Sequence, residues 1–252
     1  MNIIVKSALR VLEILDLFNS SDTSLSEKEI SVQLNIPPSS LYHLLSTMVA
    51  AEYLRKDYVR RYKLGSKVIR LGNKAREDLD LYNESLPYLN KLSQQLNETI
   101  FLAYPSGKEI VYLTKLDCNH SIKTSAQPGA NKPIYCTGLG KACLSFYSEE
   151  KMDRLLQTGK LESITPNTIK SKSSLKKQLA TFRNQGYAID DEENEMGLYC
   201  VASPIISAEG EVIAAISCAG PKERMLSNEL IPKKIKNTAL LISKAMGASR
   251  KE

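Results

Sequence analysis

Cysteine and histidine are the side chains of this sequence best suited to nucleophilic, redox or metal chemistry. The sequence contains five cysteines, Cys118, Cys136, Cys143, Cys200 and Cys218. They form no CxxC pair, and the two histidines, His43 and His120, lie far apart, so we predict neither a disulfide framework nor a metal site. Two alternatives stay open: an enzyme with Cys200 as nucleophile and His120 as base, and a redox sensor that uses Cys200 or Cys218. Because the sequence contains no P-loop, GxGxxG or nucleophile motif, we expect neither an enzyme nor a cofactor.

A second set of chemically useful residues lies between positions 39 and 47. Leu41, Leu44, Leu45 and Met48 follow the spacing i, i+3, i+4, i+7, which predicts a helix with these residues toward the core. The opposite face carries short polar side chains and one imidazole: Ser39, Ser40, Tyr42, His43, Ser46 and Thr47. Such side chains near a helix N-terminus suit the base edges and phosphates of a DNA major groove. A polar face that only contacts solvent is the alternative.

Basic side chains follow along segment 53–65, where aromatic and β-branched residues predict a β-hairpin. The cations of this hairpin are Arg55, Lys56, Arg60, Arg61 and Lys63. We expect them to contact phosphates or the minor groove. Through Arg76, twelve Lys and Arg oppose seven Asp and Glu, so this end carries +5 of the total charge of +6. That distribution favours a polyanionic partner at the N-terminal end.

A glycine-containing turn, Thr137–Lys141, precedes an apolar helix in the second half of the sequence. Backbone N–H groups at such a position can donate to an anion, although an ordinary helix start is the alternative. Cys200 and Ser217 begin and end a pair of predicted strands, which would place them side by side. From these residues alone, positions in a strand core are the simpler interpretation of both.

The elements that must position residues 39–47 and the basic hairpin follow from periodicity and capping signals. We predict a helix over 5–18, then a capping box from Ser26 to Glu29 that opens a second helix ending near Leu34. Pro38 suits the first turn of the third helix, where a missing N–H costs nothing. Three helices followed by a hairpin predict a winged helix-turn-helix.

The rest of the sequence predicts helices mixed with antiparallel strands. We expect helices over 66–80, 84–97 (opened near Pro87), 138–147, 149–157, 173–185 and 227–246, and strands over 99–104, 109–116, 199–206 and 212–219. No apolar run approaches the roughly 20 residues of a membrane span, and the N-terminus lacks the features of a signal peptide. We therefore expect a cytoplasmic α+β protein with no membrane partner.

Taken together, these motifs resemble the IclR family of transcriptional regulators over nearly the whole sequence. The resemblance is carried by residues 7–15, 36–48 and 62–65 in the first half and by 137–142, 186–193 and 197–205 in the second. It implies a winged helix-turn-helix DNA-binding domain at 1–65, a linker helix at 66–82 and a GAF/profilin-like α/β effector-binding domain at 83–252.

The family resemblance also implies a function. We expect a transcription regulator, a repressor or an activator, that binds double-stranded operator DNA as a homodimer or homotetramer, with an affinity controlled by a small anionic effector, an organic acid or sugar acid. The effector-binding residues implied by the resemblance are Gly138, Leu139, Gly140, Asp190, Cys200, Ser217 and Ala219. Leu139 is bulky and Ala219 lacks a hydroxyl at positions where the family has small polar residues, so we expect an effector other than glyoxylate.

Three departures from the family pattern concern the DNA-binding half. His43 stands where the recognition helix usually has Arg, and Glu52 stands where a Gly usually opens the wing. The wing tip, 57–60, also lacks its usual Gly. These departures affect the base and wing contacts rather than the predicted fold.

Overall fold

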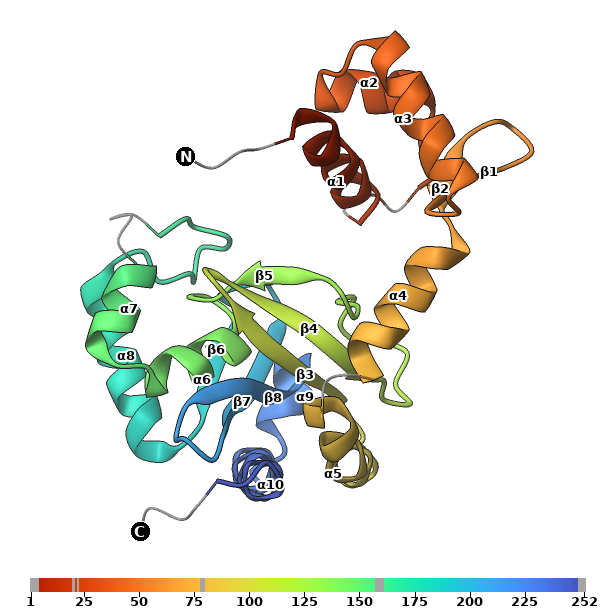
Figure 1. The fold of residues 1–252 in the computed structure, drawn as a ribbon. Helices are drawn as coiled ribbons and strands as arrows, with labels where there is room; N and C mark the ends of the chain where they lie inside the picture. The colour runs from red at the N-terminus through yellow and green to blue at the C-terminus, as the bar shows by residue number, and fades with distance from the viewer. Residues whose placement is uncertain (1–4, 20, 22, 78–79, 157–160, 249–252) are drawn as a thin grey trace. The chain divides into compact units, whose positions relative to one another are not determined.

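The computed structural model describes residues 5–19, 21, 23–77, 80–156 and 161–248. They divide into two compact units, Met1–Leu79 and Asp80–Glu252, drawn in red to orange and in yellow to blue in Figure 1. Among the described residues, no helix combines the length and hydrophobicity needed to cross a membrane.

The first unit is a winged helix, as predicted. Its elements are α1 (Lys6–Asn19), α2 (Glu27–Leu34), α3 (Pro38–Ala50), the antiparallel strands β1 (Leu54–Lys56) and β2 (Tyr62–Leu64), and α4 (Ser66–Glu77). Ile14, Ile30 and Leu41 are fully buried at the centre of its core. Leu25 exchanges two backbone hydrogen bonds with Tyr62, of 3.1 and 2.8 Å, which attach the segment before α2 to the hairpin.

Local sequence signals determine where α2 begins and ends. Ser26 and Glu29 form the predicted capping box: the Ser26 hydroxyl accepts from the Glu29 N–H, and the Glu29 carboxylate accepts from the Ser26 N–H at 2.6 Å. Asn35 ends the helix in the left-handed conformation, with φ 49°. Pro38 then occupies the first turn of α3, so the connection between the two helices is short.

The second unit is a six-stranded antiparallel sheet in the order β5-β4-β3-β8-β7-β6. The strands are β3 (Thr99–Ser106), β4 (Glu109–Leu116), β5 (Asn131–Pro133), β6 (Ala188–Asp191), β7 (Leu198–Ile206) and β8 (Val212–Pro221). The helices are α5 (Asp80–Leu96), α6 (Gly138–Phe146), α7 (Glu149–Leu155), α8 (Lys172–Gln185), α9 (Lys222–Leu226) and α10 (Ile231–Ala245).

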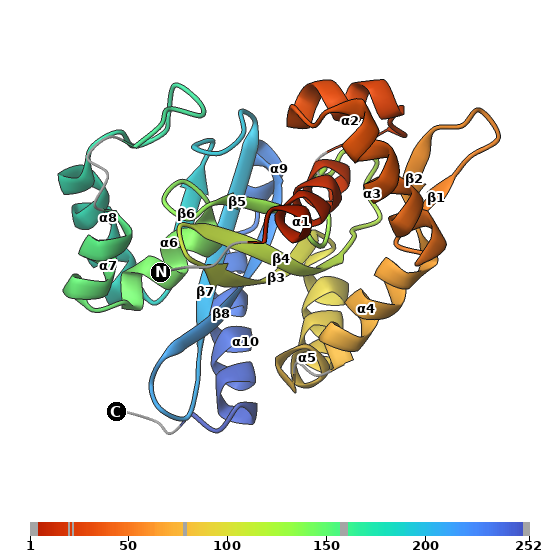
Figure 2. The ribbon, with the colours of Figure 1, turned by 45° about the horizontal axis from the view of Figure 1, so that its top comes forward.

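Helices cover both faces of this sheet, giving three layers (Figure 2). Ile100 and Leu102 of β3 pack in one hydrophobic cluster with the buried residues of α5 and α10. Phe101 and Ala103, one position along, pack in another cluster with the buried residues of α6 and α8. Because successive side chains of a strand point to opposite faces, each strand contributes to both layers. The predicted α+β class is confirmed.

Some boundaries differ from the predictions. The helix expected to open near Pro87 begins at Asp80, because its buried stripe already includes Leu81 and because Pro87 lies on the exposed side. The last helix, expected over 227–246, begins only at Ile231, and a separate short helix before it, α9, was not predicted. The strands β5 and β6 were not predicted, because three or four residues are too few to show a period of two.

Candidate functional site

The polar face of α3 is free to contact a partner. Leu41, Leu45 and Met48 are buried in the unit's core, as predicted. The side chains expected to bind DNA lie on the other face, where Ser39, Tyr42, His43 and Ser46 are exposed and Ser40 is half-buried. Tyr42 is 53% exposed although it is large and aromatic, so its position is not explained by packing within the unit.

The wing presents Arg55 and Arg60 to solvent. Asp57 shapes the turn, because its Oδ1 accepts from the N–H groups of Val59 (3.1 Å) and Arg61 (2.9 Å). Arg60 adopts φ 61° at the tip, one of the positions where the family pattern has a Gly. Lys56, a further predicted DNA contact, is exposed but holds its ammonium 4.8 Å from the centre of the Tyr62 ring.

Arg61 differs from the other predicted DNA contacts because its guanidinium is already bonded within the unit. Its Nε and one terminal nitrogen donate to the Ser24 carbonyl at 3.0 and 2.6 Å, and that terminal nitrogen also reaches the Glu29 carboxylate at 2.7 Å. Hydrogen bonds from Ser26 and from Arg61 lower the pKa of Glu29 to about 2. Arg61 therefore fastens the wing to the capping box of α2.

In the second unit, the strand register brings the predicted effector residues together on the face covered by α6. Asp190 of β6 pairs with Cys200 of β7, and Cys200 pairs with Ala219 of β8, so these three form a row across the sheet. Ser217 lies in the neighbouring row, opposite Phe101 of β3. Its buried hydroxyl lies against the Cys200 thiol, whose pKa this contact lowers, but makes no hydrogen bond of standard geometry within the described structure.

The start of α6 packs directly on this row. A Cβ at Gly138 would lie 2.7 Å from the Cys200 sulfur, so the two residues are in contact and leave no gap for a ligand between them. The Thr137 hydroxyl caps the helix by accepting from the Gly140 N–H at 3.1 Å, and the Thr137 carbonyl accepts from the Lys141 N–H. Two amides of the turn expected to receive an anion are thus used within the helix.

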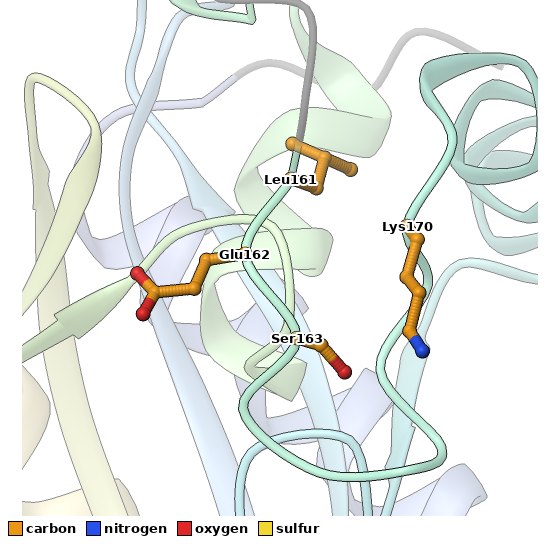
Figure 3. Close-up of a pocket in the computed structure, with 4 residues that line it drawn as sticks. All are labelled: Leu161, Glu162, Ser163 and Lys170. Carbon is orange, nitrogen blue, oxygen red and sulfur yellow. The ribbon is translucent and has the colours of Figure 1, made fainter.

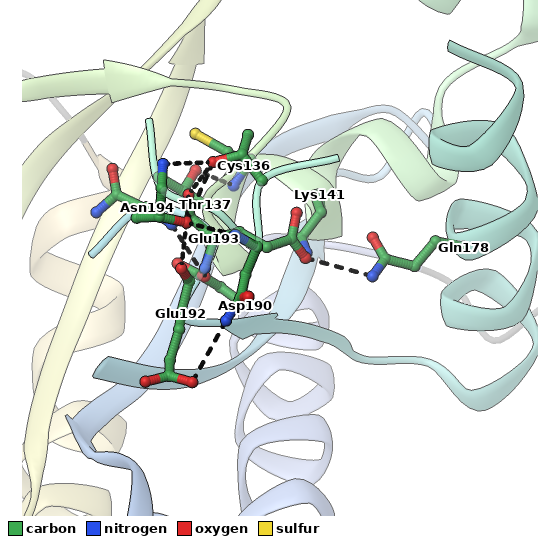
Figure 4. Close-up of polar contacts among 12 residues, drawn as sticks. Cys136, Thr137, Lys141, Gln178, Asp190, Glu192, Glu193 and Asn194 are labelled. Atoms are coloured by element: carbon green, nitrogen blue, oxygen red, sulfur yellow. Dashed lines mark hydrogen bonds and ion pairs between the residues drawn. The ribbon is translucent and has the colours of Figure 1, made fainter. Parts of the chain in front are cut away.

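A buried ion pair lies beside the row (Figure 4). The ammonium of Lys141, fully buried, is paired with the carboxylate of Glu193, which also accepts from the Gln178 amide at 3.3 Å. The Glu193 backbone carbonyl accepts from the hydroxyls of Thr165 and Thr168, at 3.2 and 2.6 Å. These bonds fix the turn after β6 against α6 and α8.

Asp190 is buried next to this pair. Its Oδ1 accepts from the N–H groups of Glu193 and Asn194 at 2.8 and 3.3 Å. Burial raises the pKa of Asp190 to about 7, against the lowering effects of Lys141 and of the two backbone hydrogen bonds; the Glu193 carboxylate raises it further.

The state of the thiols does not support the two alternatives based on cysteine, an enzyme with Cys200 as nucleophile and a redox sensor. All five cysteines are buried, and burial raises the pKa of Cys136, Cys143 and Cys200 to about 12. A thiol in that range is almost fully protonated near neutral pH, whereas nucleophilic and redox-sensing cysteines react as thiolates. A ring nitrogen of His120, the expected base of the enzyme alternative, is in hydrogen-bond contact with Asn97.

Two open cavities of the second unit lie apart from the predicted effector residues. Figure 3 shows one of about 500 Å³, with Leu161, Glu162 and Ser163 on one segment and Lys170 on the facing segment. Another, of about 560 Å³, lies between the β7–β8 hairpin and α10. Neither is lined by a residue predicted to bind the effector.

Sequence reasoning missed the polar partners of the predicted pocket. Lys141 and Glu193 were each part of a recognised motif but were not assigned to each other, since 52 positions separate them. Tyr112 was also missed; it is buried, stacks edge-on with Phe101 at 4.9 Å, and has its pKa raised by burial and by the nearby Cys200 and Asp190. No local signal in the sequence connects these positions.

A winged helix with a free polar face, joined to an α/β unit with an interior polar cluster, defines a DNA-binding regulator with a separate sensing domain. The chain belongs to the IclR family of bacterial transcriptional regulators. The family's helix-turn-helix domain matches residues 7–58, and its C-terminal domain matches residues 73–244. The predicted function as a DNA-binding, effector-controlled transcription regulator is thereby confirmed, and the redox alternative gains no support.

Relatives span nearly the whole chain. The transcriptional regulator XynR of Escherichia coli is 32% identical over 247 residues, covering 97% of this chain and 98% of its own. The repressor AllR of E. coli is 33% identical, covering 94% and 89%. Among solved structures, the IclR protein of Thermotoga maritima has a TM-score of 0.77 at 28% identity, covering 96% and 99%. An IclR homologue of Microbacterium hydrocarbonoxydans in complex with 4-hydroxybenzoate shares the fold, with a TM-score of 0.85 at 24% identity, covering 96% and 100%.

Proposed function

We propose that this protein represses transcription by inserting the polar face of α3 into the major groove of its operator, with the wing on the adjacent backbone. The observation that carries the proposal is the division of α3 into a buried apolar face and an exposed face of hydrogen-bonding side chains. Ser39, Tyr42, His43 and Ser46 are the residues assigned to base edges and nearby phosphates. Arg55 and Arg60 are assigned to phosphates, and Arg61 to holding the wing in place.

The proposal includes a homodimer or a dimer of dimers. A single winged helix reads only a few base pairs, so specific recognition calls for two or more copies. Val5, Leu9 and Leu12 form an apolar stripe on and before α1 that is 59%, 41% and 57% exposed, and a second copy of the chain would cover it. Sedimentation at micromolar concentration should show no monomer; a monomer with and without DNA would contradict this part.

The second part of the proposal is that a small organic or sugar acid binds beside Gly138, Leu139, Gly140, Asp190, Cys200, Ser217 and Ala219. The Ser217 hydroxyl, whose polar neighbour is the Cys200 thiol, offers a donor, and the Phe101–Tyr112 pair, Leu139 and Ala219 offer an apolar wall. Because Gly138 and Cys200 are in contact, the ligand lies beside them rather than between them. The 4-hydroxybenzoate bound by one structural neighbour makes aromatic acids the first to screen.

DNA binding is tested with the full-length protein and a duplex from its own promoter. Tyr42→Ala or His43→Ala should change which base is preferred, by ~1–3 kcal/mol per lost contact. Arg60→Ala should weaken binding to all DNA sequences alike. It should also reduce the slope of log affinity against log salt concentration by about 1. Arg154→Ala, an exposed cation of α7, is the charge-matched control and should leave both unchanged. If the α3 variants keep wild-type preference and affinity, the assigned surface is wrong.

Effector binding is tested by thermal-shift screening of organic and sugar acids, since a ligand of the folded state raises the melting temperature. Ser217→Ala should weaken a binding acid by about 1 kcal/mol or more. Ser207→Ala, in the turn directly after β7, is the control and should keep wild-type affinity. Equal affinity in both variants would place the pocket elsewhere.

A further inference from the structure

The buried charges beside the proposed effector site determine how an anion can enter it. Three side chains beside the site form a cluster of groups that can carry a charge near neutral pH. Lys141 is 0%, Asp190 2% and Glu193 4% exposed. Lys141 and Glu193 are paired, so their charges offset each other. Among the described residues, no cation forms an ion pair with Asp190; its Oδ1 accepts from the backbone N–H groups of Glu193 and Asn194.

Within the part of the chain that the structure describes, the groups that face Asp190 from the surrounding elements include no cation besides Lys141. They are Lys141 of α6, Cys136 before α6, Cys200 of β7, Tyr112 of β4 and Glu193 of the turn after β6. The two thiols and the phenol are neutral near pH 7, because burial raises the pKa of each. An ionised Asp190 therefore leaves the cluster with one uncompensated negative charge, and an anionic ligand would make it two.

Two adjacent carboxyl groups in a buried site do not both ionise; one keeps its proton, and its O–H donates a hydrogen bond to the other. On the basis of the proposed function, we infer that the effector's carboxylate binds only when Asp190 is protonated, so that each binding event takes up one proton and affinity falls as the pH rises. The Asp190 O–H then donates to the effector carboxylate, a short charge-assisted hydrogen bond, with the Ser217 hydroxyl as a second donor.

This assignment gives Asp190 a role in selectivity. In its protonated form the site accepts a carboxylate; in its ionised form the site repels one and favours an uncharged ligand. Burial raises the pKa of Asp190 to about 7, so both forms exist near neutral pH. Above that pH, the affinity for an acid should fall by close to tenfold per pH unit, as for any equilibrium that takes up one proton.

The experiment compares 4-hydroxybenzoate with its uncharged isostere 4-hydroxybenzamide, by calorimetry on the full-length protein at pH 6, 7 and 8. Each pH is measured in two buffers of different ionisation enthalpy, which gives the number of protons taken up. Wild-type protein should bind the acid with affinity that falls as pH rises, with uptake approaching one proton at pH 8, and should bind the amide without pH dependence. Asp190→Asn should bind the acid with pH-independent affinity and no proton uptake.

Asp191→Asn is the matched control, because Asp191 is the next residue of β6 and is paired with Lys222 at 2.6 Å. It should behave as the wild type. A pH-independent affinity of the wild type for the acid, or equal proton uptake by Asp190→Asn, overturns the inference and leaves the proposed effector class intact. Failure of 4-hydroxybenzoate to bind either protein at pH 6 overturns aromatic acids as the effector class, and the inference with it.

Discussion

The two units of this regulator place their candidate functional residues in opposite environments. On α3, Tyr42 and His43 are exposed, while Leu41 and Leu45 of the same helix are fully buried. In the second unit, Asp190 and its neighbours are themselves part of the interior. In the proposed function, DNA recognition and stability thus depend on different residues of one helix, whereas in the sensing domain the same residues serve both effector binding and stability. Substitutions should therefore separate the two properties in the first unit and couple them in the second.

Removing the buried cation tests this coupling with the largest expected effect. Lys141→Met leaves the Glu193 carboxylate buried without its partner, which should destabilise the second unit by about 3–5 kcal/mol. Urea-induced unfolding followed by circular dichroism measures the loss. The double variant Lys141→Met, Glu193→Leu removes both charges and should regain most of the stability. If the single variant is as stable as the wild type, the Lys141–Glu193 pair does not stabilise the second unit, and the contrast between the two units fails.

The pH dependence of stability tests the same cluster. Because the pKa of Asp190 is raised to about 7 in the folded protein, against about 3.9 when unfolded, the folded state binds the proton more tightly. Its contribution to stability is therefore complete below about pH 4 and decreases by up to ~1.4 kcal/mol per pH unit as the pH rises toward 7. Unfolding of wild-type and Asp190→Asn protein in urea at pH 5, 6, 7 and 8 should show this slope in the wild type only. Parallel pH profiles would show that Asp190 does not titrate in this range.

The same contrast explains how much could be predicted from the sequence. The face of α3 and the capping box at Ser26 depend on residues three to seven positions apart, so periodicity and capping rules predicted both. The pairing of Lys141 with Glu193 depends on the strand order β3-β8-β7-β6 and on the seating of α6. That arrangement is a property of the tertiary fold, and no spacing in the sequence encodes it. The role of Arg61 was missed for the same reason, since its acceptor, Ser24, lies 37 positions away.

Arg61 provides an exception that sharpens the comparison, because it is a wing cation with a structural role. Arg61→Ala should destabilise the first unit by about 1–2 kcal/mol, since hydrogen bonds to the Ser24 carbonyl are lost. Arg61→Lys keeps the charge but not the forked geometry, so most of the loss should remain. Hydrogen exchange of the first unit measures the effect. If Arg61→Lys is as stable as the wild type, charge alone matters at this position, and a direct phosphate contact becomes the better assignment.

The smallest expected effect is a gain, at the residue that opens the wing. Glu52 adopts φ 63°, a left-handed conformation that costs a non-glycine residue roughly 1–2 kcal/mol and glycine almost nothing. Glu52→Gly relieves this strain but loses the exposed ion pair with Arg70 and adds flexibility to the unfolded chain, so we expect a net gain of about 0.5 kcal/mol in urea unfolding. Glu52→Ala loses the same ion pair and keeps the strain, and should not gain. Equal stability of the two variants would mean that the backbone at Glu52 is not strained. A gain confined to Glu52→Gly would show that the native side chain can be removed at this exposed position without loss of stability, unlike the side chains of the buried ion pair.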